Sequence, residues 1–279
     1  MAKTWLITGA NRGLGAEIAK AALDSGDRVI ATGRDRDAVI RSFGPDSDHL
    51  ISLALDVTNL AQAEAAVAAA VARFGGIDIL VNNAGYGHLG IFEETTPEDA
   101  QAQFATNVFG AFNVTRAVLP VMRRARNGRI FNISSIAGIR GSVGGGLYCA
   151  SKHALEGFSE AIAKEVEGFG IFVTIVEPGF FRTGFLSADS ARFAENPVAD
   201  YAEASAQLRS FYKQRNGQQA GDPLKLAALF VQLANEAKPP LRFAAGSDAV
   251  EIAQIKITAL QTELDRWRGV SMTTDGHFA

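Results

Sequence analysis

The chain has 279 residues, of which 47% are hydrophobic and 20% charged, so it can form a large core and is neither disordered nor fibrous. Its net charge of −3 argues against nucleic acid as a main partner, because binding a phosphate backbone needs a strongly positive surface. The single cysteine, Cys149, cannot form an intrachain disulfide, and the four histidines lack metal-ligand spacing. We therefore expect a single domain over residues 1–279, no metal site and a reducing, cytoplasmic location.

The start of the chain enters a strand-like segment and shows no secretory signal pattern. The longest wholly apolar run, Ala65 to Ala72, is far shorter than the roughly 20 residues that span a bilayer. We expect an unprocessed chain without a membrane span.

Short β-branched runs alternate along the chain with longer segments of helical period. Parallel strands need crossovers of a dozen or more residues, and right-handed crossovers place helices on both faces of a sheet. The pattern predicts an α/β fold with a Rossmann-type doubly wound, mostly parallel seven-stranded sheet that binds its ligand at the carboxyl ends of the strands. The predicted strands are residues 4–8, 28–33, 50–55, 77–82, 129–134, 171–177 and 241–244.

A glycine-rich segment, TGANRGLG, joins the first predicted strand to a predicted helix. Gly9, Gly13 and Gly15 follow a GxxxGxG spacing rather than the more common GxGxxG. Glycines at such a turn let the backbone approach a pyrophosphate, and the free N–H groups at the start of the helix favour an anion. The segment predicts a dinucleotide-binding loop.

The end of the second predicted strand should lie beside the adenosine ribose of such a cofactor. Gly33 stands where a carboxylate would bind a ribose 2′-hydroxyl, whereas Arg34 and Arg12 can pair with a 2′-phosphate. The sequence therefore favours NADP(H). Asp35 leaves NAD(H) as an alternative.

A long helix is predicted over residues 98–124. Thr96 and Pro97 are typical of an N-cap and a first helical residue. Arginines within residues 123–126, followed by Asn127 and Gly128, are typical of a helix end with a turn residue at the stop.

Ser135 follows the fifth predicted strand, and Tyr148 and Lys152 lie in a YCASK segment further on. Their spacing of four residues places Tyr148 and Lys152 on one helix face, with Cβ atoms roughly 5–6 Å apart. We expect all three side chains to face one cleft, where the intervening GSVGGG leaves room for a bulky ligand. Cys149 points about 100° away from Tyr148 and is expected to pack in the protein.

Residues 184–221 form a long connection between the sixth and seventh predicted strands. We expect a helical lid whose lining suits an apolar or aromatic substrate. A C-terminal helix and tail are expected over residues 248–279, with the helix at about 248–268. The aromatic residues of the lid are Phe185, Phe193, Tyr201, Phe211 and Tyr212.

These segments together resemble the short-chain dehydrogenase/reductase family. The resemblance covers residues 3–183 and continues, toward the 17β-hydroxysteroid-dehydrogenase-like subgroup, in EVEGFGIFVTIVEPGFFRT and PPLRFAAGSDA. It implies that Asn107, Ser135, Tyr148 and Lys152 form a catalytic tetrad in which Asn107 holds a water that passes protons to Lys152. The motifs that carry it are TGANRGLG, NNAG at 82–85, Asn107, Ser135, YCASK and PGFFRT at 178–183.

The resemblance also implies the remaining contacts to NADP(H). Asp56 and Val57 would meet the adenine, NNAG would pack on the adenosine half, and PGFFRT would orient the nicotinamide amide. The full set of cofactor residues is Gly9, Asn11, Arg12, Gly13, Leu14, Gly15, Arg34, Asp56, Val57, Asn83, Ala84, Gly85, Tyr148, Lys152, Pro178, Gly179, Phe181 and Thr183.

The chemistry of the tetrad can be argued from charge. Hydride transfer to a ketone leaves a negative oxygen, which needs a proton donor and a second hydrogen bond. Tyr148 would donate the proton and Ser135 would hold the oxygen. A lysine charge about 5 Å away would lower the pKa of the phenol by about two units at an effective dielectric constant of 20, and burial would oppose this shift.

We therefore predict an NADP(H)-dependent oxidoreductase that interconverts a ketone and a secondary alcohol on small molecules, with a steroid among the candidates. The alternatives are an NAD-dependent alcohol dehydrogenase and a non-catalytic NADP(H)-sensing protein on the same fold. The helices at 98–124 and 148–168 resemble those that pair subunits in this family, which implies a homodimer or homotetramer. His88, after the NNAG segment, is a further candidate for substrate contact.

Overall fold

The computed structural model describes residues 2–187 and 190–276. Its strands are β1 (Thr4–Ile7), β2 (Arg28–Gly33), β3 (Leu50–Ala54), β4 (Ile79–Asn82), β5 (Gly87–Leu89), β6 (Gly128–Ile133), β7 (Ile171–Pro178), β8 (Ala191–Phe193) and β9 (Arg242–Ala245). Seven of these form a parallel sheet in the order β3-β2-β1-β4-β6-β7-β9. This confirms the predicted Rossmann-type sheet, whose strand order reverses beside β1, at the place where such sheets bind ligands.

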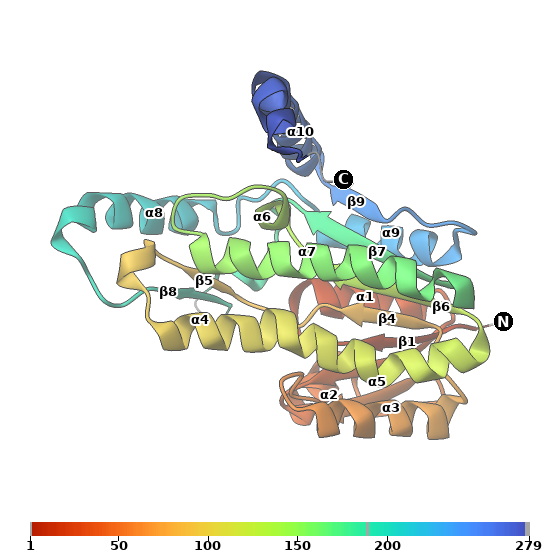
Figure 1. Cartoon of the computed structure of the whole chain (residues 1–279). Coiled ribbons are helices and arrows are strands. Elements are labelled where there is room, and N and C mark those ends of the chain that lie inside the picture. The colour runs from red at the N-terminus through yellow and green to blue at the C-terminus, as the bar shows by residue number, and fades with distance from the viewer. Residues whose placement is uncertain (1, 188–189, 277–279) are drawn as a thin grey trace.

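Helices cover both faces of the sheet (Figure 1). They are α1 (Gly13–Asp24), α2 (Arg36–Phe43), α3 (Leu60–Phe74), α4 (Pro97–Phe104), α5 (Gly110–Ala125), α6 (Ile136–Ile139), α7 (Gly146–Val166), α8 (Ala202–Arg215), α9 (Pro223–Asn235) and α10 (Ser247–Ser271). Trp5 and Ile7 pack toward α1 and α9, whereas Leu6, between them, packs toward α3 and α5 on the other face. Because both faces are covered, the strands are apolar along nearly their whole length.

The helix predicted over 98–124 is interrupted in the structure. Between α4 and α5 lies a π-helical turn, Ala105–Phe109, in which the N–H of Gly110 donates to the carbonyl of Ala105 five residues earlier. Such a turn holds one extra residue, which the apolar periodicity of a sequence does not reveal.

The predicted start of that helix is confirmed, and its predicted end is confirmed to within one residue, with Arg126 as the turn residue. The Thr96 hydroxyl accepts from the N–H of Asp99, and the Asp99 carboxylate accepts from the N–H of Thr96. At the other end α5 stops at Ala125, and Arg126, not Asn127, adopts the left-handed conformation with φ 52°.

The segment predicted as a helical lid is only partly helical. It contains α8, but it also contains β8, which pairs with β5 in a separate parallel ladder. Each of these strands has three residues, too few for a recognisable alternation in the sequence. Residues 188 and 189 of the lid lie outside the described residues.

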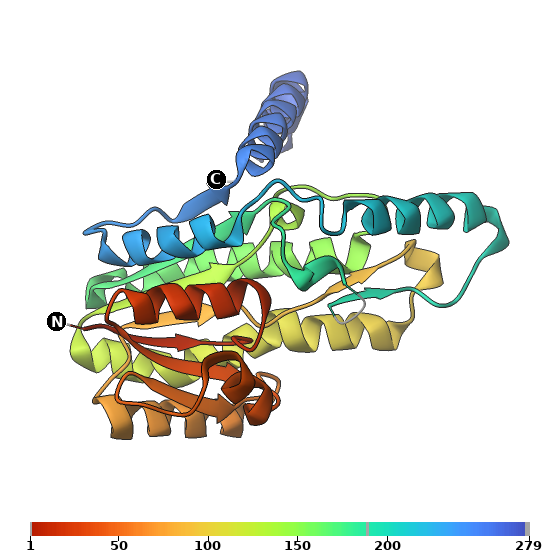
Figure 2. The same cartoon turned by 180° about the vertical axis from the view of Figure 1, so that it is seen from behind.

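The C-terminal helix α10 projects away from the rest of the molecule in both views (Figure 1 and Figure 2). Its base contacts α6 and β9, and every residue from Ile257 to its end is exposed. The predicted tail beyond residue 276 lies outside the described residues. In the part of the chain that the structure describes, no helix is both long and apolar enough to cross a bilayer.

Candidate active site

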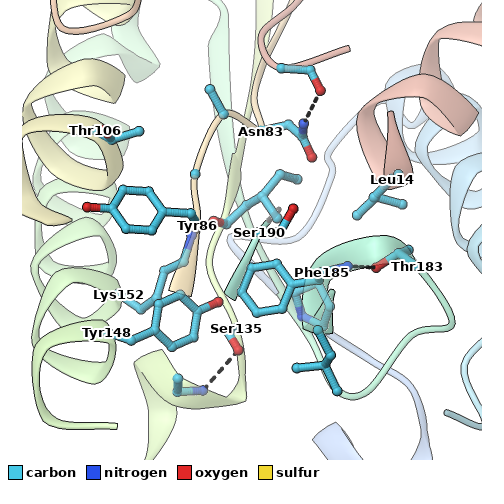
Figure 3. A pocket seen from close by; sticks show the side chains of 18 of the residues that line it. Leu14, Asn83, Tyr86, Thr106, Ser135, Tyr148, Lys152, Thr183, Phe185 and Ser190 are labelled. Carbon is cyan, nitrogen blue, oxygen red and sulfur yellow. Dashed lines mark hydrogen bonds between the residues drawn. The ribbon is translucent and has the colours of Figure 1, made fainter. Parts of the chain in front are cut away.

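A cavity of about 750 Å³ lies at the carboxyl ends of the strands (Figure 3). Its walls come from the segments that follow β1, β2, β3, β4, β6 and β7, and from the lid. The predicted cofactor residues that line it are Gly9, Asn11, Arg12, Gly13, Leu14, Arg34, Asp56, Val57, Asn83, Ala84, Gly85, Tyr148, Lys152, Pro178, Gly179, Phe181 and Thr183. The fold therefore brings together, at one sheet edge, residues from six separate stretches of sequence.

Gly15 is the predicted cofactor residue that does not line the cavity, because it is buried against the loop that follows β4. A Cβ atom on Gly15 would lie 2.4 Å from Asn83 Nδ2 and 2.6 Å from the Gly9 carbonyl oxygen. Asn83 Nδ2 itself donates to the carbonyls of Thr8 and Gly9, at 2.9 and 3.1 Å. Glycine at position 15 thus lets the two loops approach each other closely.

The glycines at the other two positions of the motif have a conformational role. Gly9 and Gly13 have φ values of 63° and 57°, which residues with a side chain rarely adopt. The turn that they form leads into α1, whose N-cap residue Arg12 makes no side-chain capping hydrogen bond. The first turn of α1 therefore begins at the wall of the cavity, where Arg12, Gly13 and Leu14 all lie.

The residues after β2 divide between the cavity and the next helix. Gly33 and Arg34 line the cavity, whereas Asp35 does not. The Asp35 carboxylate accepts from the N–H of Asp37 at 2.9 Å, capping α2, and pairs with Arg41 at 3.3 Å. Asp35, the residue that kept NAD(H) as an alternative cofactor, thus caps α2 and does not face the cavity.

Ser135, Tyr148 and Lys152 meet at one wall of the cavity, and the hydroxyls of Ser135 and Tyr148 point toward each other (Figure 3). Ser135 caps the short helix α6, its Oγ accepting from the N–H of Ala137 at 3.2 Å. Tyr148 and Lys152 come from the first two turns of α7. The Lys152 ammonium donates to the Ile133 carbonyl at 2.6 Å and lies 5.7 Å from the centre of the Tyr148 ring.

The expected lowering of the Tyr148 pKa is wrong for the protein on its own. Burial raises the pKa of the phenol well above its ordinary value, and a hydrogen bond from Ser135 only partly opposes this. Burial also lowers the pKa of Lys152 to about 8, against the nearby charge of Glu156. With its pKa raised by burial, Tyr148 is protonated at neutral pH.

A profile of the family described as short chain dehydrogenase matches residues 3–192. The chain belongs to the short chain dehydrogenase family, whose members are oxidoreductases. Oxidoreductase BOA17 from Botryotinia fuckeliana is 36% identical over 98% of this chain and 100% of its own. A 3-ketodihydrosphingosine reductase from Bacteroides thetaiotaomicron is 39% identical over 86% of this chain and 87% of its own.

Solved structures are similar to the chain over most of its length. A short-chain dehydrogenase from Streptomyces avermitilis has a TM-score of 0.90 and 40% identity, and covers 99% of this chain and 100% of its own. ElxO with NADP bound has a TM-score of 0.71 and 28% identity, over 87% of this chain and 96% of its own.

In this dehydrogenase Asn107 lies in the π-helical turn, is 2% exposed and does not line the cavity. Its side chain donates to the Tyr86 carbonyl at 3.0 Å and to Ser151 Oγ at 3.2 Å, and accepts from the N–H of Tyr86 at 3.1 Å. A Cβ atom on Gly85 would lie 3.1 Å from Asn107 Oδ1 and 3.8 Å from Lys152 Nζ. Asn107 therefore lies near Lys152, and its role in holding a water stays a prediction.

Some of the aromatic side chains of the lid line the cavity, and others do not. The ring of Phe185 lies 5.6 Å from that of Tyr148, so the lid closes directly over the candidate proton donor. Phe193 and Tyr201 do not line the cavity. The lid side chains of aromatic or aliphatic character that line it are Phe185, Leu186, Leu208, Phe211 and Tyr212.

The structure also tests the expectations for His88 and Cys149, which lie outside the tetrad. His88 is buried in β5 with its Nε2 3.2 Å from Asp99 Oδ1, and it does not line the cavity, so the suggested substrate contact is not supported. Cys149 is buried with its Sγ 3.7 Å from Ser142 Oγ, as expected for a residue that packs.

The residues that line the cavity but were not selected by the sequence analysis include Tyr86, Arg192 and Gln219. The Arg192 guanidinium, from β8, lies 4.9 Å above the Tyr86 ring. Tyr86 follows NNAG directly and was recognisable by its position. Arg192 and Gln219 lie in the long lid connection, where no residue pattern sets them apart.

Gln219 is the more informative of the two lid residues. It is 2% exposed, and neither its side-chain nitrogen nor its side-chain oxygen has a hydrogen-bond partner in the protein. A buried amide costs free energy unless both atoms are paired. Because this amide belongs to the cavity wall, a bound molecule is the natural source of its partners.

Proposed function

We propose that this dehydrogenase uses NADP(H) to interconvert a ketone and a secondary alcohol, with Tyr148 as the proton donor and acceptor. The observation that carries the proposal is the convergence of the Tyr148 and Ser135 hydroxyls at the wall of the cavity that the glycine loop also lines. Two hydroxyls at one point suit a reacting oxygen, which needs one proton and one stabilising hydrogen bond.

The residues present fit NADP(H). Gly9 and Gly13, which adopt positive φ values in the loop after β1, would let the backbone approach a pyrophosphate, and the start of α1 would face its charge. Arg34 would pair with the 2′-phosphate, and Asp35 is engaged as the cap of α2. Phe181 and Thr183 would border the nicotinamide. When bound, NADPH supplies the hydride.

The side chains of the protein would then transfer the proton and stabilise the charges that result. Tyr148 is protonated at neutral pH because burial raises its pKa, so the Tyr148 hydroxyl can donate to the substrate oxygen. Ser135 Oγ would hold that oxygen by a second hydrogen bond. Lys152, charged below about pH 8, would stabilise the tyrosinate left behind and bind the nicotinamide ribose.

The cavity lining supports an apolar or aromatic ketone as substrate. Phe185, Phe211 and Leu208 form its lid side, and Val143 from the GSVGGG segment also lines it. The relative from Bacteroides thetaiotaomicron is named as a reductase of a keto compound, which agrees with reduction of a ketone here. The 17β-hydroxysteroid-dehydrogenase-like subgroup and the cytoplasmic location stay predictions.

The direct test is NADPH depletion, followed at 340 nm as is usual for this cofactor, over ketones graded in size and apolar area. We expect turnover with at least one apolar or aromatic ketone. Tight NADPH binding without turnover across the panel would favour the alternative, an NADP(H)-sensing protein.

Replacement of Arg34 by aspartate is expected to lower kcat/KM for NADPH at least tenfold, since it removes a charge-assisted contact worth about 1.5–3 kcal/mol and adds a repelling charge. The value for NADH should stay the same or rise. Arg41→Ala is the matched control, because Arg41 pairs with Asp35 outside the cavity. A preference for NADH in the unaltered protein would favour the alternative, an NAD-dependent alcohol dehydrogenase.

Replacement of Gln219 by leucine is expected to raise the KM for either NADPH or the ketone about tenfold. The melting temperature of the protein should stay the same or rise. The leucine fills a similar volume and removes a buried amide that has no protein partner. Separate KM values for NADPH and for the ketone identify which molecule the amide binds. If neither KM changes, Gln219 does not contact a ligand.

The chain is proposed to form one domain and to assemble as a homodimer or homotetramer through α4, α5 and α7. A small groove on this side is lined by apolar residues of α5 and α7 together with Thr115, Arg116 and Arg123, and Phe109, which contacts Phe112 of the groove, is 55% exposed. The groove residues include Phe112, Leu119, Pro120, Phe158 and Ile162.

A further inference from the structure

The projecting helix α10 exposes an apolar stripe that the proposed reaction does not use. Val250, Ile257, Leu260, Leu264 and Trp267 are 52–61% exposed, and Ala253 lies between the first two. Soluble monomers rarely leave so much contiguous apolar surface in water unless it binds a partner.

The stripe has the spacing of a helix pair. Successive members are separated by three, four, three, four and three residues, from Val250 through Ala253, Ile257, Leu260 and Leu264 to Trp267. This is the 3.5-residue period at which two α-helices pack along each other over nearly three heptads. We call these six residues the α10 seam.

We propose that the α10 seam pairs in antiparallel orientation with the seam of a second copy of this chain, about a twofold axis beside Ile257 and Leu260. Ile257 then faces Leu260 of the partner subunit, and Ala253 faces Leu264 of the partner subunit. Val250 faces Trp267 of the partner subunit. The Ala253 and Val250 layers each combine a smaller with a larger side chain, and the central layer pairs two side chains of equal size, so no layer is left empty or overfilled.

Charges at the edge of the seam complement each other in this orientation. Lys256 immediately precedes Ile257, and Glu263 immediately precedes Leu264, so both flank the seam on the same side. Antiparallel pairing brings Lys256 opposite Glu263 of the partner subunit, and the symmetry repeats the contact. A parallel pair would instead place Ala253 against Ala253 and Trp267 against Trp267, which leaves a gap in one layer and crowds another.

The charge of α10 argues against a membrane surface as the occupant. Residues 247–271 contain four acidic and three basic side chains, without the basic face that amphipathic helices use on anionic bilayers. The chain's own body is also excluded for the outer part of the seam, because α10 points away from it (Figure 2).

The pairing would also affect the candidate active site, because residues near the start of α10 lie at the cavity wall. Ile252 lines the cavity, and the Asp248 carboxylate accepts from the N–H of Phe180 at 2.8 Å in the segment that follows β7. Pairing places Trp267 of the partner subunit against Val250, one turn of helix from this wall. The second copy would thus hold the cavity wall in place, although the pairing itself does not depend on the proposed reaction.

The first experiment is the mass of the full chain in solution by light scattering and sedimentation. Ile257→Asp and Leu260→Asp place a charge in the seam and are each expected to weaken self-association about 100-fold or more, halving the mass at low micromolar concentration. Thr262→Asp is the matched control on the opposite side of α10 and should leave the mass unchanged. Far-UV circular dichroism checks that every variant keeps its helices.

Two results would overturn the pairing. One is an equal mass for the seam variants and the unaltered chain. The other is that the unaltered chain is monomeric, whether or not it binds vesicles of phosphatidylcholine and phosphatidylglycerol. Association through α4, α5 and α7 is distinguished because it would survive both seam substitutions.

The second experiment tests the orientation. Ala253→Cys and Leu264→Cys chains are mixed under reducing conditions, allowed to exchange subunits and then oxidised; the native Cys149 is buried. Antiparallel pairing predicts disulfides between the two different variants and none within either variant alone. Disulfides formed only between identical variants would overturn the antiparallel orientation, and the absence of any would overturn the pairing.

Discussion

Replacement of Tyr148 by phenylalanine is expected to lower kcat for ketone reduction by about 10²–10⁴-fold, the range that a positioned general acid supplies. The substitution removes only the hydroxyl, so the ring can keep its packing against Phe185. Steady-state reduction by NADPH measures the loss, and NADPH fluorescence titration measures cofactor affinity, which should be unchanged within about twofold.

Tyr201→Phe is the matched control, because the Tyr201 hydroxyl donates to Glu93 outside the cavity. We expect near-normal kcat for this variant. Near-normal kcat for Tyr148→Phe would instead remove the proton-donor assignment and leave a water or another side chain to protonate the substrate.

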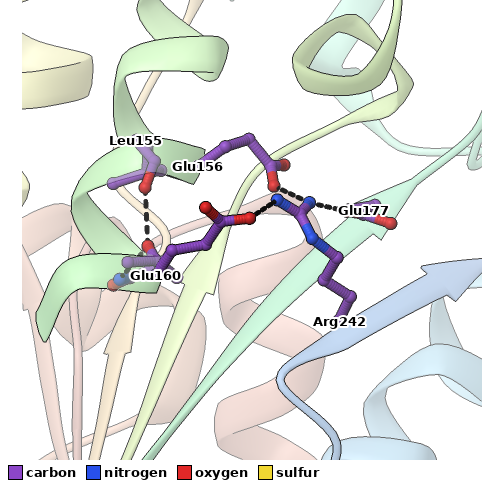
Figure 4. Close-up of polar contacts among 7 residues, drawn as sticks. Leu155, Glu156, Glu160, Glu177 and Arg242 are labelled. Carbon is purple, nitrogen blue, oxygen red and sulfur yellow. Dashed lines mark hydrogen bonds and ion pairs between the residues drawn. The ribbon is translucent and has the colours of Figure 1, made fainter. Parts of the chain in front are cut away.

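Replacement of Arg242 by methionine is expected to cost about 2 kcal/mol of unfolding free energy at pH 8. Arg242, from β9, forms ion pairs with Glu156 and Glu160 of α7 and with Glu177 of β7 (Figure 4). Glu156 and Glu177 are 5% and 4% exposed, so the substitution leaves two buried carboxylates without their cation. We expect a smaller loss of unfolding free energy than for a fully buried ion pair, because the Arg242 side chain is itself 42% exposed.

The loss should be smaller at pH 5 than at pH 8. Burial and the neighbouring Glu156 raise the pKa of Glu177, and Arg242 opposes this shift. An acid with a raised pKa in the folded state holds its proton at pH values where the unfolded chain has lost it, so stability falls as pH rises above the ordinary glutamate range. Without Arg242 the pKa of Glu177 rises further and this fall becomes steeper.

Urea unfolding at pH 5 and pH 8 measures both parts of this expectation. Arg268→Met is the matched control, since Arg268 pairs with exposed Asp265 on α10. The double variant Arg242→Met with Glu177→Gln should recover part of the loss at pH 8. Equal losses at both pH values would show that Arg242 stabilises the fold through packing rather than through charge.

The elements of the sheet were predictable because their signals are local. Residues 28–33 and 171–177 are apolar runs bounded by turn residues, and each forms a strand within one residue of the predicted bounds. The glycine loop was predictable because Gly9 and Gly13 need positive φ and Gly15 has no space for a Cβ atom. Thr96 was recognisable as a cap because its partner, Asp99, lies three residues away.

The features that the sequence did not reveal depend on what surrounds each residue in space. The pKa of Tyr148 is governed mainly by burial, which does not follow from a spacing of four residues. The unpaired amide of Gln219 is likewise a property of the assembled cavity wall. The contact between β5 and β8 joins residues about a hundred positions apart through three-residue strands.

The π-helical turn at Ala105–Phe109 makes chain length, rather than side-chain identity, the critical variable in that segment. A regular α-helix turns by about 100° per residue, so deletion of one residue there would rotate everything before it relative to α5. Asn107 would then lose the Tyr86 backbone, and Gln103 would lose its hydrogen bond to the N–H of His88. Substitution of exposed Phe109 should therefore be far better tolerated than an insertion or deletion between residues 105 and 109.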